Sequence, residues 1–223
     1  MIGGLDRVRN GRELNQEGGI GMRISGGGRR GTLILAVGLM VGLILGAGSS
    51  ARAERSHPLV KLETSMGDIT LELYSDKAPV TVANFLENVK AGFFNGTIFH
   101  RVINGFMLQG GGLDAKMNKK PTRAPIKNEA DNGLTNDAYT VAMARTGDPN
   151  SATAQFFINT VNNAFLNHTA KTPQGWGYAV FGKVVKGKEV VDKIKAVETA
   201  NQGMHQNVPV KPVTIIKATV VQK

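Results

Sequence analysis

The chain has 223 residues, 41% of them hydrophobic, no cysteine and a formal net charge of +10. This length allows one domain, or one domain preceded by a leader segment. The absence of cysteine excludes disulfide bonds, a thiolate nucleophile and zinc sites with cysteine ligands. It also suits export to an oxidising compartment, where free thiols would form incorrect disulfides.

The N-terminal part differs in composition from the rest. Residues 1–31 are rich in glycine and arginine, residues 32–48 (TLILAVGLMVGLILGAG) form an uncharged apolar run, and residues 49–53 are SSARA. A basic segment, a short apolar run and an A-x-A-like site are typical of a secretory signal peptide. We therefore predict a signal peptide with a basic, disordered N-terminal extension over 1–53, followed by one domain over 54–223.

This leader leaves three points open. Translation is expected to start at Met22, because MRISGGGRRG would then begin a leader of ordinary length. An uncleaved inner-membrane anchor is the alternative to cleavage, but the apolar run is shorter than the ~20 residues of a membrane-spanning helix. Arg29 and Arg30 leave export by the twin-arginine route open beside the general secretory route.

The positive charge is spread over the domain. Residues 1–53 hold seven basic and three acidic side chains, which leaves 20 basic and 14 acidic residues and a net charge of +6 in the remainder. Only residues 117–127 (MNKKPTRAPIK) are denser in basic residues, and no aromatic residue lies among them. A nucleic-acid-binding surface is expected to have a concentrated basic stripe or stacking aromatic residues. The sequence therefore predicts a solvated surface and no nucleic-acid partner.

Hydrophobic periodicity predicts the secondary structure of the domain. Alternating apolar and polar residues in 59–65 and 68–74, joined by a Met-Gly turn, predict a β-hairpin. Pro79 fits the first turn of a helix whose apolar face ends at Gly92. The remaining predicted elements are strands at 97–103, 106–109, 139–144, 155–160, 178–184 and 213–221, and a helix that begins near Lys188.

This set of elements indicates a mainly β fold. Many short strands, two helices and long polar loops favour a barrel or sandwich whose ends are closed by the helices. The loops at 110–138 and 144–154 are longer than a connection requires, so we expect them to contribute to function.

Side-chain alternation predicts which residues share a surface. Arg101 is expected to share a face with Phe99 and Ile103. His100 and Val102 would point the other way, which predicts a hydrogen-bonded histidine inside the barrel. One consistent arrangement gives an outer surface with an apolar floor, one guanidinium and two amides: Arg101, Met107, Gln109, Gln155 and Phe157.

This surface lacks the groups that most enzymes use. It has no acid pair for proton transfer, no serine or cysteine beside a base, and no histidine pair at metal-ligand spacing. We therefore predict no metal, no cofactor and a reaction that breaks no covalent bond. On the residues alone, Arg101 is equally compatible with a structural ion pair.

Three segments carry a resemblance to a known family: FHRVINGFMLQGGG (99–112), AMARTGDPNSATAQFFINTVNNAFLNH (142–168) and GYAVFGKVVKGKEVVDKI (177–194). They closely resemble the cyclophilins, and among these the periplasmic enzymes of Gram-negative bacteria, over residues 58–222. The resemblance implies an eight-stranded antiparallel closed β-barrel capped by two α-helices, peptidyl-prolyl cis-trans isomerase activity and a periplasmic location.

The resemblance also implies roles for individual residues. Arg101 corresponds to the catalytic arginine, and Gln109 to the glutamine that orients it and binds the substrate carbonyl. Gln155 corresponds to a substrate-binding amide, and Ala144 to a residue at the edge of the pocket. The residues that match the pocket for the proline ring are Phe106, Met107, Phe157 and Leu166.

Three residues near this site depart from the family pattern. Phe165 stands where the eukaryotic members have the tryptophan that contacts cyclosporin, so we expect cyclosporin A to bind only weakly. Tyr178 replaces the pocket histidine and places a phenol at the rim. Arg145 replaces an asparagine that binds substrate through its backbone, so this change is expected to be tolerated.

The resemblance implies partners as well. The expected substrates are unfolded or partly folded proline-containing polypeptides, and the enzyme is expected to be a monomer without stable membrane association after leader removal. The alternative is a proline-recognising chaperone or binding module in which turnover is incidental. Arg101 favours the enzyme, because holding a peptide would require the apolar floor and the amides more than a buried charge.

Overall fold

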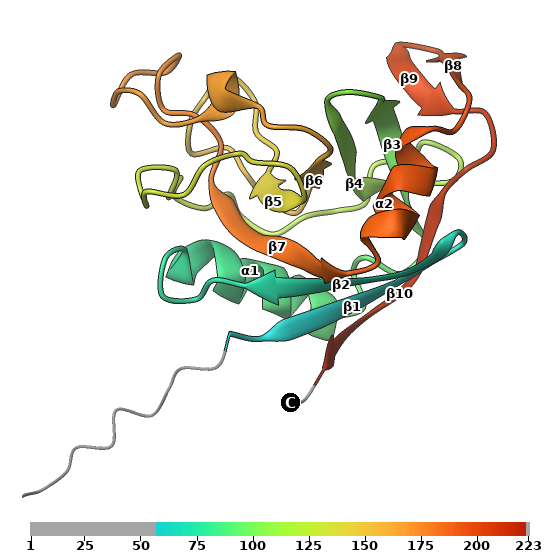
Figure 1. The fold of residues 1–223 in the computed structure, drawn as a ribbon, viewed down its shortest axis with the longest axis horizontal. Coiled ribbons are helices and arrows are strands. Elements are labelled where there is room, and N and C mark those ends of the chain that lie inside the picture. Colours follow the sequence, from blue (N-terminus) through green and yellow to red (C-terminus); the bar gives the residue numbers. More distant parts are fainter. Residues whose placement is uncertain (1–56, 222–223) are drawn as a thin grey trace, which may run out of the picture. The chain divides into compact units, whose positions relative to one another are not determined.

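The structure, a computed structural model, describes residues 57–221 (Figure 1). The leader predicted over 1–53 lies outside these residues. No helix in the described part of the chain is both long and apolar enough to cross a membrane.

Eight strands form a closed antiparallel barrel, as predicted (Figure 1). Their order around the barrel is β1-β10-β3-β4-β6-β5-β7-β2, so the first and last strands of the domain are neighbours. The bounds are β1 Leu59–Thr64, β2 Gly67–Leu73, β3 Thr97–Ile103, β4 Met107–Asp114, β5 Thr140–Met143, β6 Phe156–Asn159, β7 Val180–Lys186 and β10 Thr214–Val221.

The two predicted helices, α1 (Pro79–Lys90) and α2 (Lys188–Lys195), pack their apolar faces into the core of this barrel. The ring of Phe85 on α1 lies 4.9 Å from that of Phe94 and 5.4 Å from that of Phe156, measured between centroids. Helix α2 buries Val191 and Ile194 completely. Burial of these apolar side chains holds both helices on the barrel.

Helix α1 takes its N-terminal cap from a distant loop. Its own N-cap residue, Ala78, has no side-chain oxygen, and the carboxylate of Glu129 accepts hydrogen bonds from the backbone N–H groups of Val80 (3.1 Å) and Thr81 (2.8 Å). The Thr81 hydroxyl donates to the same carboxylate at 2.7 Å. A negative group at this end also interacts favourably with the helix dipole. Through these contacts Glu129 links the loop after β4 to the start of α1.

We expect Glu129→Gln to lower the free energy of unfolding by about 1 kcal/mol, because the amide has one acceptor oxygen and no charge. Urea unfolding followed by circular dichroism measures this change. Glu198→Gln is the matched control, since Glu198 is an exposed acid outside any helix. Equal stability of the two variants would contradict the capping role.

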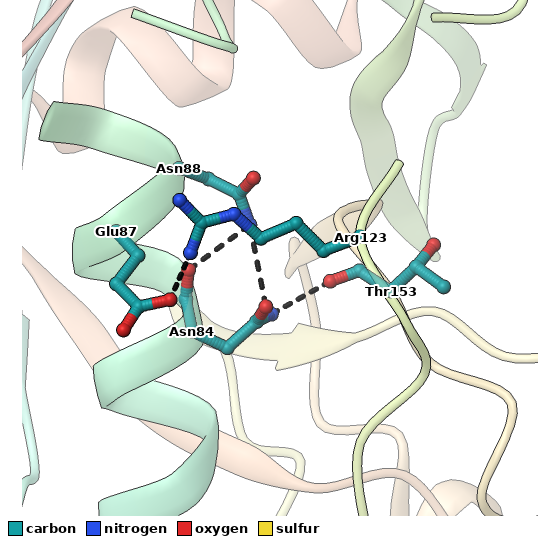
Figure 2. Close-up of polar contacts among 5 residues, drawn as sticks. All are labelled: Asn84, Glu87, Asn88, Arg123 and Thr153. Carbon is teal, nitrogen blue, oxygen red and sulfur yellow. Dashed lines mark hydrogen bonds and ion pairs between the residues drawn. The ribbon is translucent and has the colours of Figure 1, made fainter. Parts of the chain in front are cut away.

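Helix α1 also holds both long loops (Figure 2). The side-chain amide of Asn84 donates to the backbone carbonyl of Thr153 at 2.6 Å, and Asn88 donates to the carbonyl of Asn84 at 3.0 Å. Arg123, in the loop after β4, forms an ion pair with Glu87. Polar residues of the helix therefore fix the two segments that lead into the outer surface of the barrel.

Two elements differ from the prediction. The strand predicted to end at Gln109 continues to Asp114, as β4. It includes three consecutive glycines, and glycine is unusual in the interior of a strand. A short hairpin, β8 (Thr199–Gln202) and β9 (His205–Pro209), follows α2 and lies beside β3. Only Val208 and Pro209 of this hairpin are buried, and the sequence shows no apolar alternation, so periodicity gave no signal for it.

Candidate active site

Strand pairing brings the predicted site residues into one row. Arg101 on β3 pairs with Gln109 on β4, and Gln109 pairs with Phe157 on β6. Phe157 pairs in turn with Ala142 on β5. Because directly paired residues point to the same face of a sheet, the three predicted side chains share the outer surface of the barrel.

A β-bulge in β3 determines the direction of Arg101. Phe99 pairs with Gly110 and Arg101 with Gln109, so His100 is an extra residue without a partner of its own on β4. The bulge interrupts the alternation: Phe99 is fully buried in the barrel core, whereas Arg101 lines an outer pocket. The prediction that Phe99 and Arg101 share a face is therefore wrong.

The same bulge places His100 outside the barrel. The predicted hydrogen-bonded histidine inside the barrel is wrong, since His100 lines an outer cavity and its buried Nδ1 has no hydrogen-bond partner among the described residues. Burial, together with the nearby charge of His205, lowers the pKa of His100 to about 4. The ring is neutral at pH 7, so it adds no positive charge beside Arg101.

A pocket of about 140 Å³, with an apolar floor and a polar rim, opens on this outer surface. Its floor belongs to a second apolar cluster that is separate from the barrel core and includes Met107, Phe157 and Leu166, which are 2%, 4% and 8% exposed. Nine of the predicted site residues line the pocket: Arg101, Phe106, Met107, Gln109, Ala144, Arg145, Phe157, Leu166 and Tyr178.

The other two predicted residues lie outside this pocket. Gln155 is adjacent to it, because the Gln109 side chain donates a 3.0 Å hydrogen bond to the Gln155 side-chain oxygen. Phe165, in the 3-10 helix η1 (Ala164–Leu166), is 74% exposed and stacks on Phe106 with ring centroids 5.6 Å apart. Phe165 therefore extends the apolar rim beyond the pocket.

The glycines of β4 make room for Gln155. A Cβ atom on Gly112 would lie 2.3 Å from Cγ of Gln155, and one on Gly110 would lie 2.9 Å from the carbonyl oxygen of Ile98. Both contacts are too short for any side chain at these glycines. Gly112 thus leaves room for the Gln155 side chain, and Gly110 lets β4 lie close to the backbone of β3.

The Arg101 guanidinium has no hydrogen-bond or ion-pair partner in the described part of the chain. Its central carbon lies 5.9 Å from the centroid of the Phe106 ring. Its N–H groups remain available to a ligand. Gln109 lies beside Arg101 through strand pairing, but its amide bonds Gln155 and not the guanidinium.

Arg145 uses its side chain to fasten the rim. Its Nε donates to the carbonyl of Gly177 at 2.9 Å, and its guanidinium lies over the ring of Tyr178 at 4.6 Å. The Tyr178 backbone N–H donates to the carbonyl of Leu166 at 2.9 Å. Arg145 and Tyr178, the two substituted positions at the pocket, therefore form a cation–π pair that closes one side of it.

Three buried asparagines support the pocket from below, and sequence reasoning missed them. Asn163 donates 2.9 Å and 2.7 Å hydrogen bonds to the Phe106 carbonyl and to the Asn159 side chain. Asn159 donates to the Asn136 side chain at 3.2 Å, and Asn136 donates to the Leu166 carbonyl at 3.2 Å. This asparagine ladder (Asn136, Asn159, Asn163) joins the backbones of two pocket walls.

The site also differs from a metal or acid–base centre. No cluster of three or more histidine, aspartate or glutamate side chains that could hold a metal ion occurs in the described part of the chain. No aspartate or glutamate lines the pocket. The groups that remain are two guanidiniums, the Gln109 amide, the Tyr178 phenol and an apolar floor, which can bind and orient a ligand and donate hydrogen bonds to it.

Comparison with known proteins gives the family. The family model described as "Cyclophilin type peptidyl-prolyl cis-trans isomerase/CLD" matches residues 59–220. The chain is 63% identical over 161 residues to peptidyl-prolyl cis-trans isomerase cyp18 of Streptomyces antibioticus, which covers 72% of this chain and 97% of the relative. It is 58% identical over 162 residues to peptidyl-prolyl cis-trans isomerase B of Escherichia coli strain K12, which covers 73% of this chain and 99% of the relative.

Solved structures agree with this result. A cyclophilin-type isomerase of Cryptosporidium parvum has a TM-score of 0.62 and 25% identity, covering 75% of this chain and 99% of that chain. The same protein in the presence of the dipeptide Ala-Pro has a TM-score of 0.61 and 24% identity, covering 74% and 99%, and shows likeness of fold. Since the family model spans nearly all of the described residues, and relatives more than half identical align over nearly their whole length, the chain belongs to the cyclophilin-type peptidyl-prolyl cis-trans isomerases.

Proposed function

We propose that Arg101 accelerates X-Pro isomerisation by donating a hydrogen bond to the prolyl nitrogen. The planar amide resists rotation by ~18–20 kcal/mol, because the nitrogen lone pair is delocalised into the carbonyl. At the twisted transition state this delocalisation is lost, and the nitrogen becomes a hydrogen-bond acceptor. A donor aimed at that nitrogen binds the twisted state better than either planar state, and only such differential binding accelerates the step.

The apolar pocket supplies the other half of the mechanism. Phe106, Met107, Phe157 and Leu166 would hold the proline ring in place while the preceding carbonyl rotates. Gln109 and Gln155 would bind the substrate carbonyl through the amide pair that they form at the pocket edge. Fixing the ring beside the donor converts binding energy into orientation of the reacting bond.

One observation carries this assignment: a guanidinium without a partner in residues 57–221 lines the apolar pocket. Leaving such a group unpaired in a half-buried site costs free energy unless a ligand uses it. The related Cryptosporidium parvum protein solved in the presence of Ala-Pro supports a proline-containing ligand. The test of the donor role is the Arg101→Ala variant, for which the expected result is given in the Discussion.

We propose further that the enzyme assists protein folding in the periplasm, with unfolded or partly folded chains as substrates. The signal-peptide pattern over 1–53 and the absence of cysteine support this location. X-Pro isomerisation takes tens of seconds or longer without a catalyst, which is slow enough to limit the rate of protein folding. Sequencing the N-terminus of the protein from a periplasmic fraction tests the proposal. An intact leader on protein found in the membrane fraction would support the anchor instead.

We expect cyclosporin A to inhibit only weakly. The phenyl ring of Phe165 offers no N–H donor where a tryptophan would offer one. An isomerase assay with increasing cyclosporin A measures the inhibition constant, and Phe165→Trp is the comparison variant, expected to be more sensitive. Inhibition of the unmodified protein at nanomolar concentration would contradict the expectation.

A further inference from the structure

A basic groove runs along the outer surface beyond the proline pocket. A cavity of about 580 Å³ shares Arg101 and Gln109 with the pocket and adds Lys119 and His205. A third cavity, of about 180 Å³, shares Gln109 and Lys119 with the second and adds Arg145. We call these two cavities the basic groove. No aspartate or glutamate lines the groove or the pocket.

Lys119 is the cation that both cavities share. It is exposed, and it forms no ion pair with any residue of 57–221. It lies within the loop that follows β4, the same loop whose Arg123 pairs with Glu87 on α1 (Figure 2). The loop is therefore held to the helix at one point while Lys119 faces the groove at another.

The acids near the groove have other partners. One carboxylate oxygen of Asp114 accepts backbone hydrogen bonds from Lys116 and Asn118, both at 2.9 Å, and the other accepts the Asn118 side-chain amide at 3.1 Å. These hydrogen bonds from Asn118 lower the pKa of Asp114, which keeps it ionised within the turn. Glu129 caps α1. The fold thus directs its local acids away from the groove and leaves the cations there without a counter-charge.

The groove also has a wall that is built into the fold. The bulge at His100 turns that residue and Arg101 to the same side of β3, and the β8–β9 hairpin adds His205 from beside β3. The rings of His100 and His205 lie 6.5 Å apart between centroids. The groove is therefore a continuation of the catalytic surface along which a bound polypeptide would extend from its proline.

We propose that the basic groove binds a carboxylate side chain of the substrate, aspartate or glutamate, close to the proline that is isomerised. Lys119 is the main contact. The inference rests on the proposed function, because it concerns the flanking residues of the same X-Pro substrate. A cation without a counter-charge attracts a carboxylate both in the encounter and in the bound state.

The test compares peptides that differ at one position. In an alanine-rich peptide with a single Ala-Pro bond, each of the three residues on either side of the proline is replaced in turn by Glu, Gln or Lys. At one or more positions we expect kcat/KM for Glu to exceed that for Gln by about threefold, and that for Lys to be lower than both, as for an exposed ion pair. The difference should disappear in about 1 M salt, where charges are screened within ~3 Å.

Two variants locate the effect. In the Lys119→Gln variant, the ratio of kcat/KM for the Glu peptide to that for the Gln peptide should fall towards one. The control variant is Lys116→Gln, since Lys116 is an exposed lysine of the same loop that lies outside the groove, and it should keep the ratio of the unmodified protein. Equal rates for Glu, Gln and Lys at every position overturn the inference and leave the isomerase mechanism standing. An equal loss of the preference for the Glu peptide in both lysine variants also overturns the inference, since the preference would then come from the net charge of the protein. Failure of the unmodified protein to isomerise any peptide refutes the proposed function itself.

Discussion

Replacing Arg101 by alanine is expected to lower kcat/KM for a short X-Pro peptide about a hundredfold, by analogy with the loss of an oxyanion-hole donor worth ~3–4 kcal/mol. The guanidinium has no ion pair or hydrogen bond within residues 57–221, so the variant removes a donor to the substrate and, within the fold, only its 5.9 Å contact with the Phe106 ring. A protease-coupled or NMR exchange assay measures the rate. The free energy of unfolding should change by no more than about 0.5 kcal/mol.

Arg101→Lys is the matched variant for this result. It keeps the positive charge but replaces a rigid planar group with a flexible ammonium whose donors are not fixed in direction. We expect a rate between those of the alanine variant and the unmodified protein. Unchanged turnover in Arg101→Ala would mean that the guanidinium does not stabilise the twisted amide. The pocket would then act through the binding of the proline ring alone.

The second large effect is expected from Asn159→Leu, which cuts the asparagine ladder at its centre. Asn159 is completely buried, accepts a hydrogen bond from Asn163 and donates to Asn136 and Thr140. Each buried polar group left without a hydrogen-bond partner costs about 1–3 kcal/mol. Because the variant leaves several such groups, we expect the free energy of unfolding to fall by about 3 kcal/mol or more. In a protein of this size that lowers the melting temperature by roughly 10 °C.

The ladder should affect activity as well, because it joins the backbone carbonyls of Phe106 and Leu166. At a temperature where Asn159→Leu is folded, we expect a raised KM with a smaller change in kcat. Asn201→Leu, at an exposed position on β8, is the control and should leave both quantities unchanged. A melting temperature equal to that of the unmodified protein would show that the ladder does not hold the pocket.

Much of the fold could be predicted because local periodicity and burial agree. The β1–β2 hairpin and α2 follow alternation or helical spacing, and each buries the face that its pattern indicates. Helix α1 and the last strand form where they were predicted, but β10 leaves Ile216 exposed at a shift in its pairing with β1. Alternation placed four of the pocket residues on one surface, the family resemblance supplied the others, and the structure brings nine predicted residues together around one cavity. Strand pairing explains why they meet, since residues far apart in the chain become neighbours across β3, β4 and β6.

The remainder could not be predicted for identifiable reasons. Alternation assumes a regular strand, so it could not show the bulge that separates Phe99 from Arg101. Hydrogen bonds of the ladder join residues as far apart as Asn163 and Phe106, 57 positions away, and polar residues in loops give no sign of such pairing. Gly110–Gly112 are predicted as part of the loop at 110–138, because the close contacts that require glycine inside β4 depend on the positions of distant residues such as Gln155.

The bulge at His100 decides on which side of β3 the arginine lies. Residues two apart in a regular strand share a face, so a β3 of unchanged length but without the bulge would turn Arg101 towards the barrel interior, among phenylalanines. Deleting His100 instead would leave Phe99 and Arg101 adjacent and paired with Gly110 and Gln109 in regular register, so the arginine would still face outward. The direction of this arginine therefore depends on the parity of its spacing from Phe99 and on whether the extra residue stays unpaired.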